Sequence, residues 1–229
     1  MPANNTHWLV HYWAGIYGNL GHLYGPARTE NPMPHLPYAL DNGAFGAFTQ
    51  KREWDAEAFV KHVERYAFHA LRPQWCVVPD VVADREATLA KWSQWAPVLM
   101  DRYHLSLALA VQDGMTIEDV IPLDPAPDII FVGGSTEWKW ETVPMWCASW
   151  SRVHVGRVNT GDALRICKKA GAESCDGTGW FRGRPEQIKQ LGYFLCEQAG
   201  LADEKDVDYM VRHSRLKGTD QKVLPLEAA

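Results

Sequence analysis

Short apolar runs alternate with longer amphipathic segments along most of this sequence. Most of the runs end in Gly, Asp or Pro, which is typical of buried strands, and the segments between them carry apolar residues at helical spacing. The expected strands lie at residues 7–13, 37–41, 74–80, 105–113, 128–134, 152–158 and 172–176. The expected helices cover residues 54–71, 85–103, 160–171 and 184–200. Because a crossover helix joins two parallel strands, this alternation predicts an α/β fold with a parallel sheet.

The number of expected strands is close to the eight of a (β/α)8 barrel, so we expect a compact TIM-type barrel. A doubly wound sheet is the alternative. It loses support because no G-x-G-x-x-G follows the first run and no G-x-x-x-x-G-K-[ST] occurs in the sequence. No segment has the composition of a linker, and the Pro-rich stretch 23–37 is expected to be a surface loop. Residues 1–229 are therefore expected to form a single domain.

Two residues bear on the expected helices. Thr160 is the first residue of the segment 160–171, with Asp162 close behind it, and is expected to be the N-cap of that helix. Pro97 lies inside the segment 85–103 and is expected to kink or break that helix, because proline has no N–H to donate.

Charge and cysteine content restrict the classes of partner and compartment. The net charge of −5 argues against a surface that coats nucleic acid in general, although the tail from Val211 is locally basic. Five widely spaced cysteines without a C-x-x-C pair fit reduced thiols in the cytoplasm. The N-terminus has no basic, apolar leader, and no run approaches the roughly 18 apolar residues of a membrane span. We therefore expect a cytoplasmic protein with no membrane partner.

Polar residues and glycines end most of the expected strands. They are Asp41, Asp80, Gln112, the Gly133-Gly134 pair followed by Ser135, and Asp176. Each alone could be a turn or cap residue, and the Asp-Gly dipeptide at Asp176 is common in turns. In a barrel, however, the carboxyl ends of the strands surround one mouth, where active sites lie. The set therefore predicts a ring of carboxylates, an amide and glycines around a site.

The residue types at this ring indicate a chemistry. Two carboxylates that face one site allow a retaining double displacement at a sugar carbon. A carboxylate with a glutamine can read the donors and acceptors of a planar heterocycle, and paired glycines let backbone N–H groups approach it. Phe45, Phe48 and Trp180 could stack on such a ring.

At these positions the sequence resembles the tRNA-guanine transglycosylase superfamily, whose barrel enzymes exchange guanine for a 7-deazaguanine. The resemblance covers roughly residues 38–185 and rests on five segments in the same order as in the family. They are "LDNGAFGAF", "VVPDVVAD", "LALAVQDG", "FVGGS" and "HVGRVNTGDALRICKKAGAESCDGTGWFR". Each segment is a weak signal alone, whereas the ordered set is fairly specific.

The resemblance implies a role for each residue of the ring. Asp176 is expected to be the nucleophile that attacks C1′ of the ribose, and Asp41 the general acid and base. The base would be recognised by Asp80, Gln112 and the backbone of Gly133 and Gly134, with Ser135 nearby. Arg182, six residues after Asp176, would contact phosphate or ribose.

The sequence also departs from the family. The tRNA enzymes carry a C-x-C-x-x-C…H zinc site after the nucleophile, and no cysteines here have that spacing. We therefore expect neither a metal nor a cofactor. The small, zinc-free form resembles the branch that places 7-deazaguanines in DNA, found in phages and bacterial modification systems, so DNA is favoured over tRNA as the partner. A duplex would require a flipped guanosine, and an accessory protein that opens DNA is a further candidate partner.

Two alternatives stay open at this point. One is a hydrolase or transferase that acts on a free nucleoside or sugar, which the negative charge would suit. The other is a non-catalytic barrel that only holds a purine.

Overall fold

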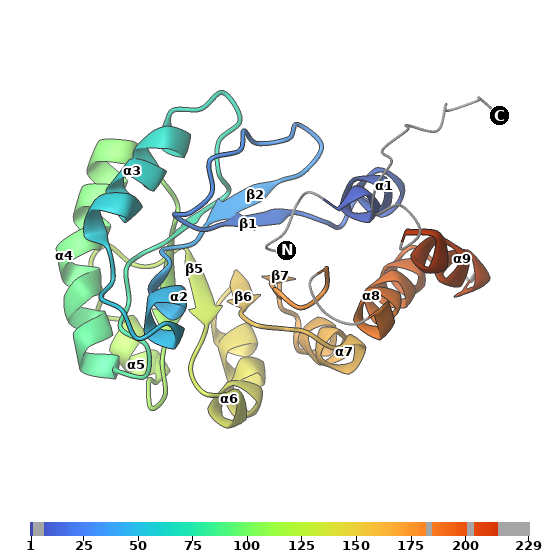
Figure 1. The fold of residues 1–229 in the computed structure, drawn as a ribbon. Helices are drawn as coiled ribbons and strands as arrows, with labels where there is room; N and C mark the ends of the chain where they lie inside the picture. The colour runs from blue at the N-terminus through green and yellow to red at the C-terminus, as the bar shows by residue number, and fades with distance from the viewer. Residues whose placement is uncertain (2–6, 182–184, 201–203, 215–229) are drawn as a thin grey trace.

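The computed structural model describes residues 1, 7–181, 185–200 and 204–214. It contains one sheet of seven parallel strands whose spatial order follows the sequence (Figure 1). The strands are β1 (His22–Tyr24), β2 (Tyr38–Leu40), β3 (Cys76–Val77), β4 (Leu107–Val111), β5 (Ile129–Val132), β6 (Val153–Val155) and β7 (Ser174–Cys175). The order has no reversal of the kind that defines a doubly wound sheet. The expected α/β class and parallel sheet are therefore confirmed.

The sheet curls but does not close in the part of the chain that is described. There β1 pairs with β2 alone and β7 with β6 alone, so the two end strands are not joined to each other. An eighth strand is not present among these residues. The observed architecture is thus an open, barrel-like sheet alternating with helices.

Helices follow most of the strands and cover the outside of the curled sheet (Figure 1). They are α1 (Trp8–Tyr17), α2 (Ala44–Thr49), α3 (Ala56–Ala67), α4 (Arg85–Tyr103), α5 (Ile117–Val120), α6 (Thr136–Ser149), α7 (Gly161–Ala170), α8 (Pro185–Gln198) and α9 (Glu204–Ser214). No helix within the described ranges is long and apolar enough to cross a membrane.

The two faces of the sheet bury different groups of side chains. Successive residues of a strand point to opposite faces, and in β4 every residue is buried. Ala108 and Ala110 belong to a small cluster with Trp75 inside the curl, whereas Leu107 and Leu109 belong to the larger core under the helices. The sheet is therefore buried on both sides, as parallel sheets usually are, and its carboxyl-end edge is left to form a site.

The largest error of the sequence-based prediction lies at the N-terminus. The expected strand 7–13 is part of helix α1, whose buried residues Leu9, Val10, Trp13 and Ala14 follow helical spacing. Strand β1 lies instead at the start of the segment 23–37 that was expected to be a loop. The helix α1 packs against α8, on the same side as the open edge of the sheet (Figure 1).

Some of the local features predicted from the sequence agree with the structure, and others do not. Thr160 caps α7 as expected, since its hydroxyl accepts from the Ala163 N–H at 3.2 Å. Pro97 does not break α4, which runs through it as one helix from residue 85 to residue 103. Helices α2, α5, α6 and α9 were not predicted. All five cysteines are free, as expected, although Cys147 and Cys175 are only partly buried.

Candidate active site

A cavity of about 520 Å³ opens at the carboxyl ends of the strands. Each of the seven strands is followed by residues that line it: Gly25, Asp41, Asp80, Gln112, Gly133 with Gly134, Arg157 and Asp176. Parallel strands carry their carboxyl ends to one edge, so residues far apart in the sequence meet here. Six of the site candidates named from the sequence are in this list, and a further one, Phe45 from α2, also lines the cavity.

Asp176 follows β7 directly and is buried, with 7% of its surface exposed. Its Oδ1 lies 3.2 Å from His154 Nε2 and accepts from the Arg157 backbone N–H at 3.3 Å. The next residue must be glycine, because a Cβ at Gly177 would lie 2.1 Å from the Val158 carbonyl oxygen. The turn after Asp176 therefore lets the chain fold back against β6 and keeps the carboxylate at the cavity wall.

Asp41 follows β2 and has an altered acidity. It lines the cavity and is partly buried. Burial, together with the negative charges of Asp176 and Asp80, raises the pKa of Asp41 to about 7. A carboxyl group with this pKa can donate and accept a proton near neutral pH, as a general acid and base must.

Asp80 is held by two side-chain amides. Its Oδ1 accepts from Asn42 Nδ2 at 2.7 Å and its Oδ2 accepts from Gln112 Nε2 at 2.8 Å. Gln112 is itself fixed, because its Oε1 accepts from the Ala83 N–H at 3.1 Å. Burial raises the pKa of Asp80 to about 6, although the Asn42 hydrogen bond and the Lys91 charge oppose the shift. The arrangement fixes the carboxylate plane while leaving a second lone pair on each oxygen.

The glycines after β5 line the cavity and pack closely against neighbouring side chains. Gly134 has φ +62°, and a Cβ there would lie 2.5 Å from the Trp138 ring. Its carbonyl oxygen accepts from an Arg157 guanidinium N–H. Ser135 does not line the cavity; it is exposed, and its backbone N–H donates to Asp113 Oδ2 at 2.7 Å. The predicted segment is thus at the site, but the Ser135 side chain is not.

Aromatic and basic side chains form the rim of the cavity. The Arg157 guanidinium lies 4.7 Å from the centre of the Phe45 ring, an attractive cation–π arrangement. Phe48, from the same helix α2, is 57% exposed. Trp180 is buried away from this cavity and lines a different one. The predicted Arg182 lies outside the described residues.

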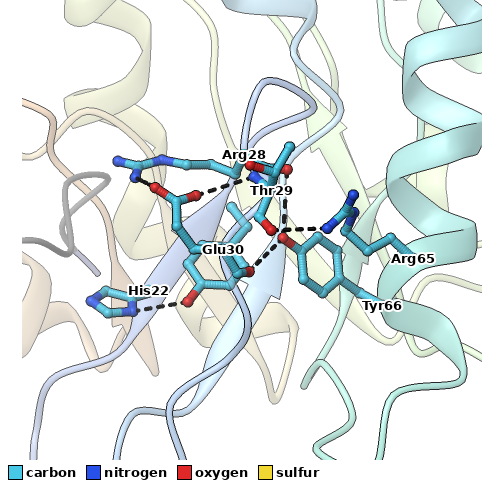
Figure 2. A network of polar contacts seen from close by, with 7 residues as sticks. His22, Arg28, Thr29, Glu30, Arg65 and Tyr66 are labelled. Atoms are coloured by element: carbon cyan, nitrogen blue, oxygen red, sulfur yellow. Dashed lines mark hydrogen bonds and ion pairs between the residues drawn. The ribbon is translucent and has the colours of Figure 1, made fainter.

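The loop after β1 brings another arginine, Arg28, to the cavity lining. Figure 2 shows how this loop is tied to α3: Tyr66 Oη donates to the Glu30 carbonyl at 2.8 Å, and Arg65 donates to the Thr29 carbonyl at 2.9 Å. Arg28 forms an ion pair with the Glu30 carboxylate at 2.7 Å. Most of the segment after β1 is exposed, as expected of a surface loop, and these contacts hold it beside the site.

Sequence reasoning did not assign a site role to two buried basic residues. His154 is fully buried in β6 and touches Asp176, and Lys139 in α6 donates from Nζ to the Gly156 carbonyl at 2.8 Å. Burial, with the nearby Arg157 charge, lowers the pKa of Lys139 to about 8. The signal that could have found Lys139 is a lysine among the tryptophans of an apolar helix face.

Within the described ranges, no group of three or more His, Cys, Asp or Glu side chains is placed to hold a metal ion. No protein-family model matches the chain, and no curated protein matches it significantly. The site is therefore interpreted from its own geometry.

Proposed function

We propose that this protein is a base-exchange transglycosylase that replaces guanine in nucleic acid by a 7-deazaguanine, with DNA favoured over tRNA. The observation that carries the proposal is that Asp41 and Asp176 line one cavity together with the amide-held Asp80. On this proposal the chain is a small, zinc-free relative of the tRNA-guanine transglycosylases, and its curled, open sheet is a variant of their TIM-type barrel.

The first step breaks the bond between guanine and the sugar. An Asp176 oxygen attacks C1′, the C1′–N9 bond breaks, and its electron pair leaves with the base. Asp41, which is protonated below its pKa of about 7, gives its proton to the departing guanine. The product is a covalent ester between Asp176 and the sugar.

The second step reverses the first with a different base. Asp41, now ionised, takes the proton from the incoming 7-deazaguanine, whose ring nitrogen attacks C1′. The Asp176–C1′ bond breaks, and Asp176 is again a free carboxylate. The exchange therefore consumes no cofactor and retains the configuration of the sugar.

The site also offers a means to recognise guanine. Guanine presents N–H donors on one edge, and Asp80 holds two oxygens in a fixed plane with lone pairs to receive them. The Gly133-Gly134 backbone also lines the cavity, with Gly133 close to the Gln112 side chain. A base that presents an acceptor instead of a donor to these oxygens is repelled by the carboxylate, which is the basis of discrimination.

The rim suits a polymeric substrate in spite of the acidic net charge. Exposed Phe48 lies in α2, and Lys51 and Arg52 follow directly after that helix, with Arg52 in the cavity lining. Aromatic rings that stack on bases and cations that contact phosphates are the common elements of single-strand recognition. A flipped guanosine could enter the cavity while its neighbours contact this rim.

The test is incubation of the purified protein with DNA or tRNA and a set of guanine analogues, followed by mass spectrometry of the released nucleosides. We expect a 7-deazaguanosine in DNA, and none when Asp176→Asn replaces the wild type. A product only from free nucleosides would favour a small-molecule transferase instead, which the net charge of −5 would suit. Tight purine binding without any product would favour a non-catalytic barrel.

A further inference from the structure

Three side chains form a hydrogen-bonded row behind the candidate nucleophile. His154 Nε2 lies 3.2 Å from Asp176 Oδ1, and His154 Nδ1 lies 2.7 Å from Ser174 Oγ. His154 comes from β6, whereas both of its partners come from β7 and its end. Strand pairing of His154 with Ser174 therefore builds the row into the sheet itself.

The imidazole at the centre of this row is tightly enclosed. His154 has 0% of its surface exposed, and its ring centre lies 4.8 Å from those of both Trp75 and Phe131. Burial lowers the pKa of His154 in spite of the opposing effect of the Asp176 carboxylate, so the ring is neutral at pH 7. A neutral imidazole has one donor and one acceptor nitrogen.

The partners decide which nitrogen carries the proton. A nucleophilic aspartate is a carboxylate, which can only accept, so with Asp176 in that role Nε2 holds the hydrogen and donates it. Nδ1 is then an acceptor, and the Ser174 hydroxyl is the group that donates to it. The row thus runs in one direction, from the serine hydroxyl through the imidazole to the carboxylate.

The same contacts distinguish the two oxygens of Asp176. Oδ1 receives both the His154 N–H and the Arg157 backbone N–H. Oδ2 has no hydrogen-bond donor among the residues that the structure describes, and Asp176 lines the cavity. Fixing one oxygen sets the plane of the carboxylate and turns the other toward the substrate.

We propose that His154, oriented by Ser174, is a positioning residue that holds Asp176 Oδ1 so that Oδ2 is the attacking oxygen. This inference rests on the proposed role of Asp176 as the nucleophile. His154 does not touch the substrate; it acts through the geometry of the carboxylate. Placement errors of about 1 Å in a reacting group can reduce turnover by roughly 100-fold.

The first test is independent of activity. In protein labelled with 15N-histidine, long-range 1H–15N spectra report which ring nitrogen of His154 is protonated. We expect a neutral ring with the proton on Nε2 between pH 6 and pH 8, and a changed Nδ1 shift in Ser174→Ala. A proton on Nδ1, or a charged ring, would overturn the proposed direction of the row.

The second test separates positioning from packing. His154→Phe keeps an aromatic ring between Trp75 and Phe131 but removes both hydrogen bonds, whereas His154→Gln keeps an N–H donor. We expect kcat for guanine exchange to fall about 100-fold in His154→Phe with KM nearly unchanged, and glutamine to restore at least part of it. Thermal unfolding of both variants measures any loss of packing.

The outcomes separate this inference from the proposed function. Exchange by the wild type together with undiminished kcat in His154→Phe would reject the positioning role alone. Absence of exchange in the wild type would reject the proposed function, while the tautomer measurement would still decide the direction of the row.

Discussion

Asp80 and Asp176 end β3 and β7 of the same sheet, yet the protein holds the two carboxylates differently. Asp80 has an amide donor on each oxygen, from Asn42 and Gln112. Asp176 has its described donors, His154 and the Arg157 backbone, on Oδ1 alone. A carboxylate fixed at both oxygens is suited to recognition, whereas one fixed at a single oxygen keeps the other for attack. The difference indicates how one ring of acids can divide binding from chemistry.

The largest expected loss of activity comes from substitution of Asp176, at the end of β7. Asp176→Asn removes the attacking oxygen, so exchange of labelled guanine should fall by at least about 10³-fold. The affinity for the base, measured by equilibrium binding, should change by no more than about threefold because Asp80 is untouched. Full exchange activity in this variant would contradict the division between the two acids.

Substitution of Asp80, after β3, is expected to weaken binding of the base more than it slows the chemical step. In Asp80→Asn the new amide must turn an NH₂ group toward Asn42 or Gln112, both of which donate to this position. We expect KM for the base to rise about 100-fold, with a smaller change in kcat. Asp113→Asn is a matched control, since Asp113 accepts from the Ser135 backbone and does not touch Asp80. A loss in kcat alone would show that Asp80 belongs with the chemical step.

Asp41 gives a prediction about stability. Its folded pKa of about 7 lies above the unfolded value of 3.8, so the folded protein binds more protons between these two pH values. The free energy of unfolding should therefore fall as pH rises from 4 to 7. Asp41→Asn should remove this loss and stabilise the protein by about 4 kcal/mol at pH 8, with little effect at pH 4. Urea unfolding at the two pH values tests this; equal effects at both would contradict the raised pKa.

The smallest effect should come from the two arginines of the rim. Arg157 borders the β7 side and contacts Phe45, whereas Arg28 on the β1 side is paired with Glu30. A plot of the logarithm of the association constant for single-stranded DNA against the logarithm of the salt concentration has a negative slope. Arg157→Met should make this slope less steep by about 0.7, the value for one phosphate contact. Arg28→Met should lower it less, because Glu30 already neutralises that charge. Equal slopes for the wild type and Arg157→Met would show that Arg157 does not contact a phosphate of the nucleic acid.

The ring of polar residues was predictable from sequence because each member lies within three residues of the end of a strand. Parallel strands bring Asp41, Asp80, Gln112 and Asp176 to one edge, so locating the strand ends located the cavity lining. The residues that hold these side chains in place were not predictable in the same way. His154 sits inside an apolar strand and meets groups 20 and 22 residues later, and no local pattern reports such a contact.

The errors at the N-terminus have a similar physical origin. Apolar residues occupy most of positions 7–13 and follow no clear period. The hydrophobic pattern therefore does not distinguish a strand from a buried helix. Strand β1 has only three residues, and its burial is decided by its pairing with β2. Tertiary contacts, rather than local propensity, set both elements.

Covalent capture of Asp176 tests the central claim most directly. Wild-type protein incubated with guanine-containing DNA and a 7-deazaguanine is denatured, digested and analysed by mass spectrometry for a sugar ester. We expect the adduct on the peptide that contains Asp176, and no adduct in Asp176→Asn. Two results would contradict the account. One is exchange by the wild type with the adduct on another residue, and the other is exchange that persists in Asp176→Asn.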